Sequence, residues 1–269
     1  MFTLRQYLLA LLDSRGLTRT LGEIDVCRDE QGRPCFSAGN SAAVFRIRLG
    51  GRIRSLRCYL RPMRHLKEIY GQRLLEKELY LHTSPETGVW VDTVLGDWIE
   101  GSTLHETVAQ AAALRDRESL QILVRLFDRL ALALVTDDRA HGDLKPENII
   151  VGDDGTLCPI DFDASYLPAF AGEISPELGT AAYQHPARTA ADFDERIDDY
   201  PAALISTALH ALAENPTLWD RYGSSDGLLY TPQRIASDPA YRETLALFEK
   251  RGMAVQSVSY THLRAHETE

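Results

Sequence analysis

The 269-residue sequence combines 44% hydrophobic with 25% charged residues, enough apolar material for a buried core in one large domain or two lobes. No stretch approaches the roughly 18 to 20 uncharged apolar residues of a membrane helix, and the first apolar run is too short for a secretory signal, so we expect a cytoplasmic protein without membrane association. The net charge is −10, and only residues 1–80 are basic, with 15 Lys and Arg against 8 Asp and Glu, which argues against a nucleic-acid partner. Four cysteines without a CxxC pair predict free thiols.

The N-terminal third has the pattern of a short helix followed by a small antiparallel sheet. Leucines and a tyrosine recur at helical spacing over residues 2–12, and Gly16 marks the end of that helix. Short β-prone segments separated by turn residues follow. The strands predicted there are 24–28, 43–48 and 54–60.

The next segment predicts an amphipathic helix over residues 66–82, because apolar residues repeat at three and four with a mild interruption at Gly71. Strands at 89–92 and 93–96 complete the small lobe. Beyond the hinge at 97–102, residues 104–137 have the composition of one long, buried central helix.

The C-terminal half predicts a strand pair, an irregular stretch that runs to about residue 197, and further helices. The tail 256–269 has no core pattern and resembles translated sequencing-adapter read-through, so we expect it to be non-native or disordered and the helical lobe to be cut short. The elements predicted in this half are strands 149–151 and 158–160 and helices 199–214 and 239–251.

The segment HGDLKPENIIVGDDGTLCPIDFD, residues 141–163, carries the most specific chemistry. Phosphoryl transfer requires an oriented hydroxyl, a neutralised γ-phosphate and a bound magnesium ion. Asp143 suits the acceptance of the hydroxyl proton, and Lys145 suits contact with the transferring phosphate. Asn148 and Asp161 supply the oxygen ligands that magnesium prefers. The alternative is a polar hairpin loop in which Asp and Asn cap turns.

These motifs resemble the catalytic loop and metal-binding segment of the eukaryotic-like Ser/Thr protein kinase family. The resemblance implies ATP and Mg2+ as cofactors. It extends to GTAAYQHPA, residues 179–187, which is similar to the end of the activation segment, where Thr180 would bond the catalytic Asp and Lys. It also implies that Asp198 anchors the catalytic loop through backbone amides. An ordinary loop and helix cap is the alternative for both.

The resemblance upstream is weaker. FSAGNSAAV, residues 36–44, is similar to the glycine-rich phosphate loop, with Gly39 at its middle glycine and Val44 over adenine, although a plain hairpin turn accounts for it nearly as well. Arg57 stands where the family has the strand lysine that binds the α- and β-phosphates. The hinge residues expected to bind or face the adenine are Asp97, Trp98 and Ile99, with ordinary core packing as the alternative for Trp98.

Two further features bear on the ion pair that the family makes with its strand lysine and on regulation. The helix glutamate would be Glu68, Glu76 or Glu78, and family spacing favours Glu76; an exposed helix face is the alternative. Gly142 replaces the arginine that usually precedes the catalytic Asp, so activity would not need a phosphorylated activation loop.

We therefore expect an α+β, bilobal, kinase-like fold. Residues 1–96 would form a lobe of strands plus one helix, 97–102 the hinge, and 103–255 the helical lobe. The expected activity is transfer of the γ-phosphate of ATP to a Ser/Thr hydroxyl of a protein substrate, with the oligomeric state left open. The alternatives are a nucleotide-binding pseudokinase or scaffold, which Arg57 favours, and a small-molecule kinase of the aminoglycoside or choline type, which Lys145 and the 179–187 segment disfavour.

Overall fold

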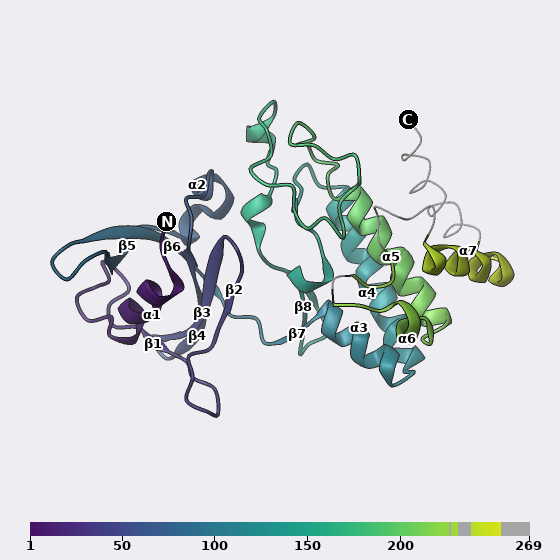
Figure 1. The fold of residues 1–269 in the computed structure, drawn as a ribbon, viewed down its shortest axis with the longest axis horizontal. Helices are drawn as coiled ribbons and strands as arrows, with labels where there is room; N and C mark the ends of the chain where they lie inside the picture. The colour runs from purple at the N-terminus through teal and green to yellow at the C-terminus, as the bar shows by residue number, and fades with distance from the viewer. Residues whose placement is uncertain (226, 231–237, 254–269) are drawn as a thin grey trace. The chain divides into compact units, whose positions relative to one another are not determined.

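The structure is a computed structural model that describes residues 1–225, 227–230 and 238–253, so the predicted tail lies outside the described residues. The chain divides into two compact units, one spanning Met1–Trp98 and a second that begins at Ile99; Figure 1 draws the first in purple and blue and the second in teal to yellow. The four cysteines are free thiols, as the sequence predicted. Within the described ranges, none of the helices combines the length and the apolar character needed to cross a membrane.

The first unit is a six-stranded antiparallel sheet with one helix packed against it. The capping box between Thr3 and Gln6 begins α1 (Leu4–Leu12). The sheet order is β1-β3-β4-β6-β5, with β2 also paired to β3. The strands are β1 (Asp25–Val26), β2 (Phe36–Ala38), β3 (Ala42–Leu49), β4 (Arg52–Tyr59), β5 (Leu74–His82) and β6 (Gly88–Asp97).

The core of this unit lies between α1 and the sheet. Tyr7 and Leu11 of α1 are buried with Phe45, Ile47 and Leu56 of the central strands. The hydroxyl of Tyr7 donates to the carbonyl oxygen of Tyr59 at 2.6 Å, and burial raises the pKa of the Tyr7 phenol. The predicted first helix and the predicted strands 43–48 and 54–60 are confirmed, and the strand predicted at 24–28 is shorter, as β1.

The predicted helix 66–82 is wrong over most of its length. The structure has α2 (Leu66–Tyr70), a 3-10 turn η1 (Gly71–Arg73) and then β5. Gly71 has φ +52, which ends the helix and which glycine adopts without strain. Leu79 and Leu81 beyond it pair with Val91 and Val89 of β6 and are buried. Short apolar runs are ambiguous between helix and strand, and pairing with β6 decides this one.

The predicted strands 89–92 and 93–96 are one continuous strand, β6. It pairs with β4 on one side and β5 on the other. Both partners are available only in the folded sheet, which explains why the sequence alone suggested two shorter strands.

The second unit is mainly helical, with a small sheet of order β7-β8-β9. The predicted strand pair and the predicted helices 199–214 and 239–251 are confirmed. The strands are β7 (Gly101–Thr103), β8 (Ile149–Gly152) and β9 (Leu157–Pro159). The α-helices are α3 (Leu104–Ala113), α4 (Arg117–Val135), α5 (Asp199–Glu214), α6 (Leu218–Tyr222) and α7 (Pro239–Arg251). The 3-10 turns are η2 (Pro146–Asn148), η3 (Phe162–Ala164) and η4 (Pro168–Phe170).

The predicted long central helix is two helices, α3 and α4. Arg115 has φ +58 and breaks the chain direction, and the side chain of Asp116 accepts a hydrogen bond from the Ser119 N–H to begin α4. Phe127 of α4 and Leu209 of α5 are fully buried in the core of this unit. Leu144, which follows the HGD motif, is buried in the same core as these two helices.

Candidate active site

The loop that carries the HGD motif is anchored by a buried carboxylate. Asp198, just before α5, is 1% exposed. Its two oxygens accept hydrogen bonds from the backbone N–H groups of His141 and of Gly142, the second at 3.0 Å. Charge-assisted bonds of this kind compensate the burial of the carboxylate. Asp198 thus makes the backbone contacts predicted for it and holds the loop just before Asp143.

The imidazole of His141 ties this loop to the segment that carries Asp161. Its Nε2 lies 2.7 Å from the carbonyl oxygen of Ile160, and its Nδ1 lies 3.3 Å from the backbone N of Asp143. Since a carbonyl only accepts and an N–H only donates, Nε2 is the donor and Nδ1 the acceptor in these two contacts. The ring also packs 5.0 Å from that of Phe162.

Two residues of the site have a left-handed backbone. Gly142 has φ +81, and a Cβ atom there would lie 2.1 Å from the carbonyl oxygen of Ala164, so no side chain fits at this position. Asp161 has φ +67 and begins η3. Strained conformations of non-glycine residues cost of order 1–3 kcal/mol and concentrate at functional sites.

The four residues predicted to be catalytic form one connected network in the second unit. The backbone N–H of Thr180 donates to Oδ1 of Asp143 at 2.5 Å, and Nδ2 of Asn148 lies 3.2 Å from its Oδ2. Lys145 Nζ lies 3.3 Å from the same Oδ2 and donates to Oγ1 of Thr180 at 2.8 Å. The side chains of Asp143 and Lys145 are 18% and 23% exposed, so they are reachable from solvent yet tightly positioned.

The donor set fits a magnesium ion that is bound together with nucleotide phosphates. Asn148 directs Nδ2 toward the backbone and side chain of Asp143, so its Oδ1 is the atom suited to a cation. The backbone N–H of Ile160, beside Asp161, donates to the carbonyl oxygen of Asn148 at 2.8 Å, which brings the two predicted ligands into neighbouring positions. Among the residues that the structure describes, no group of three His, Cys, Asp or Glu forms a complete protein cage. Magnesium needs only one or two carboxylates beside phosphate oxygens.

Arg57 and Val44, two of the nucleotide-binding residues predicted in the first unit, share one face of the sheet. Arg57 lies opposite Val44 on one side and Val94 on the other, so the three side chains form a row across β3, β4 and β6. The guanidinium of Arg57 lies 5.8 Å from the ring centre of Tyr59. Gly39 lies in the exposed turn between β2 and β3, and its backbone does not require glycine.

The predicted hinge residues lie at the boundary between the two units. Asp97 ends β6, and its backbone carbonyl accepts a hydrogen bond from the Ser55 hydroxyl at 3.1 Å. Trp98 is half-buried under the guanidinium of Arg46, 5.7 Å from its ring centre, rather than in the main core of the first unit. Ile99 begins the second unit.

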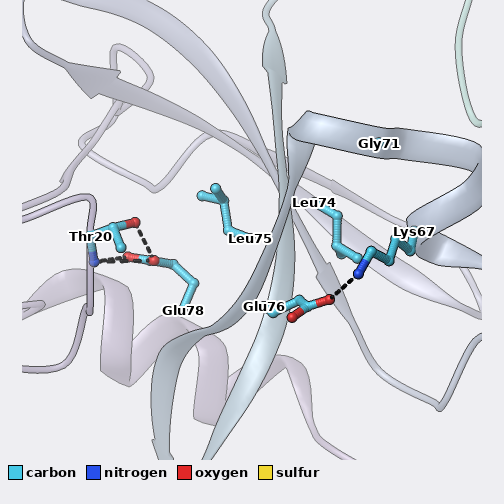
Figure 2. Close-up of a pocket in the computed structure, with 7 residues that line it drawn as sticks. All are labelled: Thr20, Lys67, Gly71, Leu74, Leu75, Glu76 and Glu78. Atoms are coloured by element: carbon cyan, nitrogen blue, oxygen red, sulfur yellow. Dashed lines mark hydrogen bonds and ion pairs between the residues drawn. The ribbon is translucent and has the colours of Figure 1, made fainter.

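The predicted helix glutamates do not share a helix. Only Glu68 lies on α2, and Glu76 and Glu78 lie on β5. Lys77 between them has φ +51, so the two side chains point to opposite sides of the strand, as Figure 2 shows. Glu76 is exposed and lies 3.7 Å from the amine of Lys67.

Glu78 is 1% exposed, and its contacts stabilise the fold of the first unit. Its carboxylate accepts hydrogen bonds from the backbone N–H groups of Arg19, Thr20 and Leu21 and from the hydroxyl of Thr20. Both glutamates line a pocket of about 330 Å³. The other residues that line it, labelled in Figure 2, are Thr20, Lys67, Gly71, Leu74 and Leu75. None of the four network residues of the second unit lines this pocket.

Sequence reasoning missed two residues beside the network, Gln184 and Arg188. The guanidinium of Arg188 donates through Nη1 to the carbonyl oxygen of Gly142 at 3.1 Å and to Oε1 of Gln184. Burial lowers the pKa of Arg188, and nearby carboxylates, Asp198 first, oppose this effect. A signal was available, because Arg188 is the only Lys or Arg between residues 146 and 195.

The chain is similar to several curated Ser/Thr protein kinases, although no model of a known protein family matches it. It is 28% identical to CBL-interacting protein kinase 17 of Oryza sativa subsp. japonica over 172 residues, 61% of this chain and 35% of the relative. It is 34% identical over 113 residues to serine/threonine-protein kinase PknL of Mycobacterium tuberculosis, 40% of this chain and 27% of that protein.

A third relative is serine/threonine-protein kinase chk1 of Schizosaccharomyces pombe, 25% identical over 160 residues, 58% of this chain and 31% of that protein. The chain therefore spans about a third or less of the length of the curated relatives it matches. The similarity supports the protein kinase class in general.

Proposed function

We propose that this chain is an ATP- and magnesium-dependent phosphotransferase that moves the γ-phosphate to a Ser or Thr hydroxyl of a protein. The observation that carries the proposal is the network that joins Asp143, Lys145, Asn148 and Thr180. The proposal assigns the first unit to the small lobe, the second to the helical lobe and residues 97–102 to the hinge. The names of the similar proteins support the same class.

In this proposal Asp143 orients the acceptor hydroxyl and takes its proton. The hydroxyl oxygen forms a new bond to the γ-phosphorus, the bond from that phosphorus to the β–γ bridging oxygen breaks, and ADP leaves with the bonding electron pair. Lys145, already 3.3 Å from Asp143, neutralises charge on the transferring group. Asn148 and Asp161 would hold the magnesium ion, which supplies further charge neutralisation. Thr180 binds both Asp143 and Lys145 and so fixes their positions relative to each other.

The experiment is transfer of label from γ-labelled ATP with magnesium to generic protein acceptors. Wild type is compared with Asp143→Asn and Asp161→Asn, and with Asp153→Asn as a matched control, because Asp153 is an exposed carboxylate outside the network. Removal of a general base typically costs about 10²–10⁴-fold in rate. We expect a loss of that order in Asp143→Asn, a loss of transfer in Asp161→Asn because a magnesium ligand is removed, and wild-type transfer in the control. Full transfer by Asp143→Asn would overturn the proposal.

A nucleotide-binding scaffold is the second candidate, and specific observations favour it. Arg57 stands at the position expected for the strand lysine. Of the glutamates expected to pair with it, Glu76 pairs with Lys67 and Glu78 accepts hydrogen bonds from the backbone of residues 19–21. A thermal-shift titration with magnesium–ATP separates the two candidates. Stabilisation of the fold without any transfer of label would favour the scaffold, whereas stabilisation with transfer favours the kinase.

A further inference from the structure

Arg188 is an isolated cation in an acidic segment. Residues 146–195 contain ten Asp and Glu but no other Lys or Arg. Its position directly after the predicted activation segment, 179–187, places it on a loop, where its backbone N–H donates to the carbonyl of His185 at 3.0 Å. A lone arginine in such a segment suggests a specific contact rather than a general surface charge.

The guanidinium of Arg188 connects the activation segment to the catalytic loop. Nη1 donates both to the carbonyl oxygen of Gly142, 46 residues earlier, and to Oε1 of Gln184, which is 5% exposed. Nε and Nη2 are buried, and within the described part of the chain they have no hydrogen-bond partner. Burial of a guanidinium with incomplete hydrogen bonding costs stability. Fold stability alone therefore does not account for an arginine at this position.

The contact acts on the peptide that orients Asp143. The N–H of Gly142 is held by the carboxylate of Asp198, and its carbonyl is held by Arg188, so this residue is fixed from both ends. Gly142 has no room for a side chain, because a Cβ atom would lie 2.1 Å from the Ala164 carbonyl oxygen. Residue 142 itself therefore cannot supply a cation to this part of the loop.

Two of the carboxylates that attract Arg188, Asp198 and Asp143, belong to the candidate active site. Four carboxylates attract it: those of Asp198, Asp143, Asp192 and Asp194. Arginine remains protonated in proteins, so the cation is permanent. It is therefore attracted both by the anchor of the loop, Asp198, and by the residue that accepts the hydroxyl proton in the proposed reaction.

We propose that Arg188 is a positioning residue that holds the Gly142–Asp143 peptide, and through it the carboxylate of Asp143, in the geometry needed for phosphoryl transfer. The inference rests on the proposed function for its catalytic consequence. Arg188 would supply the positive charge that residue 142 cannot carry. It would also link the activation segment to the catalytic loop without any phosphorylation.

The kinetic test compares Arg188→Met and Arg188→Lys with wild type. Arg196→Met is the matched control, because Arg196 is an arginine eight residues away whose side chain is 74% exposed. Misplacement of a reacting group by about 1 Å costs on the order of 10²-fold in rate. We expect kcat to fall by about that factor in Arg188→Met, with KM for ATP unchanged and no decrease in the melting temperature. Arg188→Lys should keep part of kcat, since it keeps the charge but loses the planar fork.

A second experiment tests the geometry of the loop without measuring activity. Hydrogen exchange is measured at the amide of Gly142, bonded to Asp198, and at the amide of Thr180, bonded to Asp143. Arg188→Met should accelerate exchange at both, and Arg196→Met at neither. If wild type transfers no phosphate but exchange still responds in this way, the positioning role stands and the proposed function fails.

The inference is overturned by wild-type kcat in Arg188→Met, by unchanged exchange at both amides, or by a loss of kcat that Arg196→Met reproduces. If Arg188→Met does not fold, Arg188→Lys decides: wild-type kcat together with wild-type exchange in that variant would overturn the role.

Discussion

Gly142 offers a sharp test of how this site is packed. Substitution with alanine places a Cβ atom 2.1 Å from the carbonyl oxygen and 2.8 Å from the carbonyl carbon of Ala164, which are backbone atoms that cannot rotate away. The residue also has φ +81, a conformation that costs an L-residue roughly 1–2 kcal/mol. Overpacking adds about 1–3 kcal/mol. The expected loss in the free energy of unfolding is therefore about 2–5 kcal/mol.

Gly155→Ala is the matched control, because it separates the two contributions. Gly155 has φ +77, nearly that of Gly142, but a Cβ atom there would meet nothing within 4 Å. Urea unfolding followed by circular dichroism should show only the conformational cost, roughly 1–2 kcal/mol, in the control. Equal destabilisation of the two variants would refute the reasoning about the Ala164 contact.

Three further predictions test other parts of the molecule. Glu78→Gln should destabilise the first unit by about 1–3 kcal/mol in urea unfolding, because a buried acceptor of three backbone N–H groups is weakened, and an unchanged midpoint would contradict this. The resemblance implies that Arg57 contacts the nucleotide phosphates, so Arg57→Met should weaken magnesium–ATP binding, measured by calorimetry, about 10-fold or more, whereas unchanged affinity would remove Arg57 from the site. Burial raises the pKa of Asp128, but hydrogen bonds from His210 and Ser206 outweigh it and leave the pKa below its ordinary value of 3.8. The stability from this carboxylate is present above pH 3.8 and is lost as the pH falls through the lower folded pKa, so His210→Ala should reduce the acid dependence of the melting temperature; an unchanged dependence would contradict the contact.

The order of the catalytic-loop residues was readable because each role falls on a different residue type within a short segment. Asp143, Lys145 and Asn148 lie within six positions, and the turn η2 with Pro146 brings them together through local geometry. Asp198 was readable only through the family resemblance, since its partners, His141 and Gly142, lie more than 50 residues earlier.

The glutamate assignment was not readable from the sequence. Residues 71–82 carry apolar positions compatible with either a helix or a strand, and Lys77 turns Glu76 and Glu78 to opposite sides of β5. The register shift between Leu75 and Leu79 against β6 produces this arrangement. A β-bulge depends on the partner strand, so spacing along one segment cannot reveal it.

The sequence by itself determined the elements whose signals are local. These are helices α1, α5 and α7, the β3–β4 hairpin, and the order of catalytic residue types in the loop, because neighbours within about four positions specify helix ends and turns. Tertiary structure alone decided that residues 74–82 form a strand, that Glu78 binds a loop near residue 20, and that Arg188 reaches Gly142 across 46 positions. Strand pairing and long-range hydrogen bonds depend on which distant segments meet, and that choice is made by burial of the whole core rather than by any one segment.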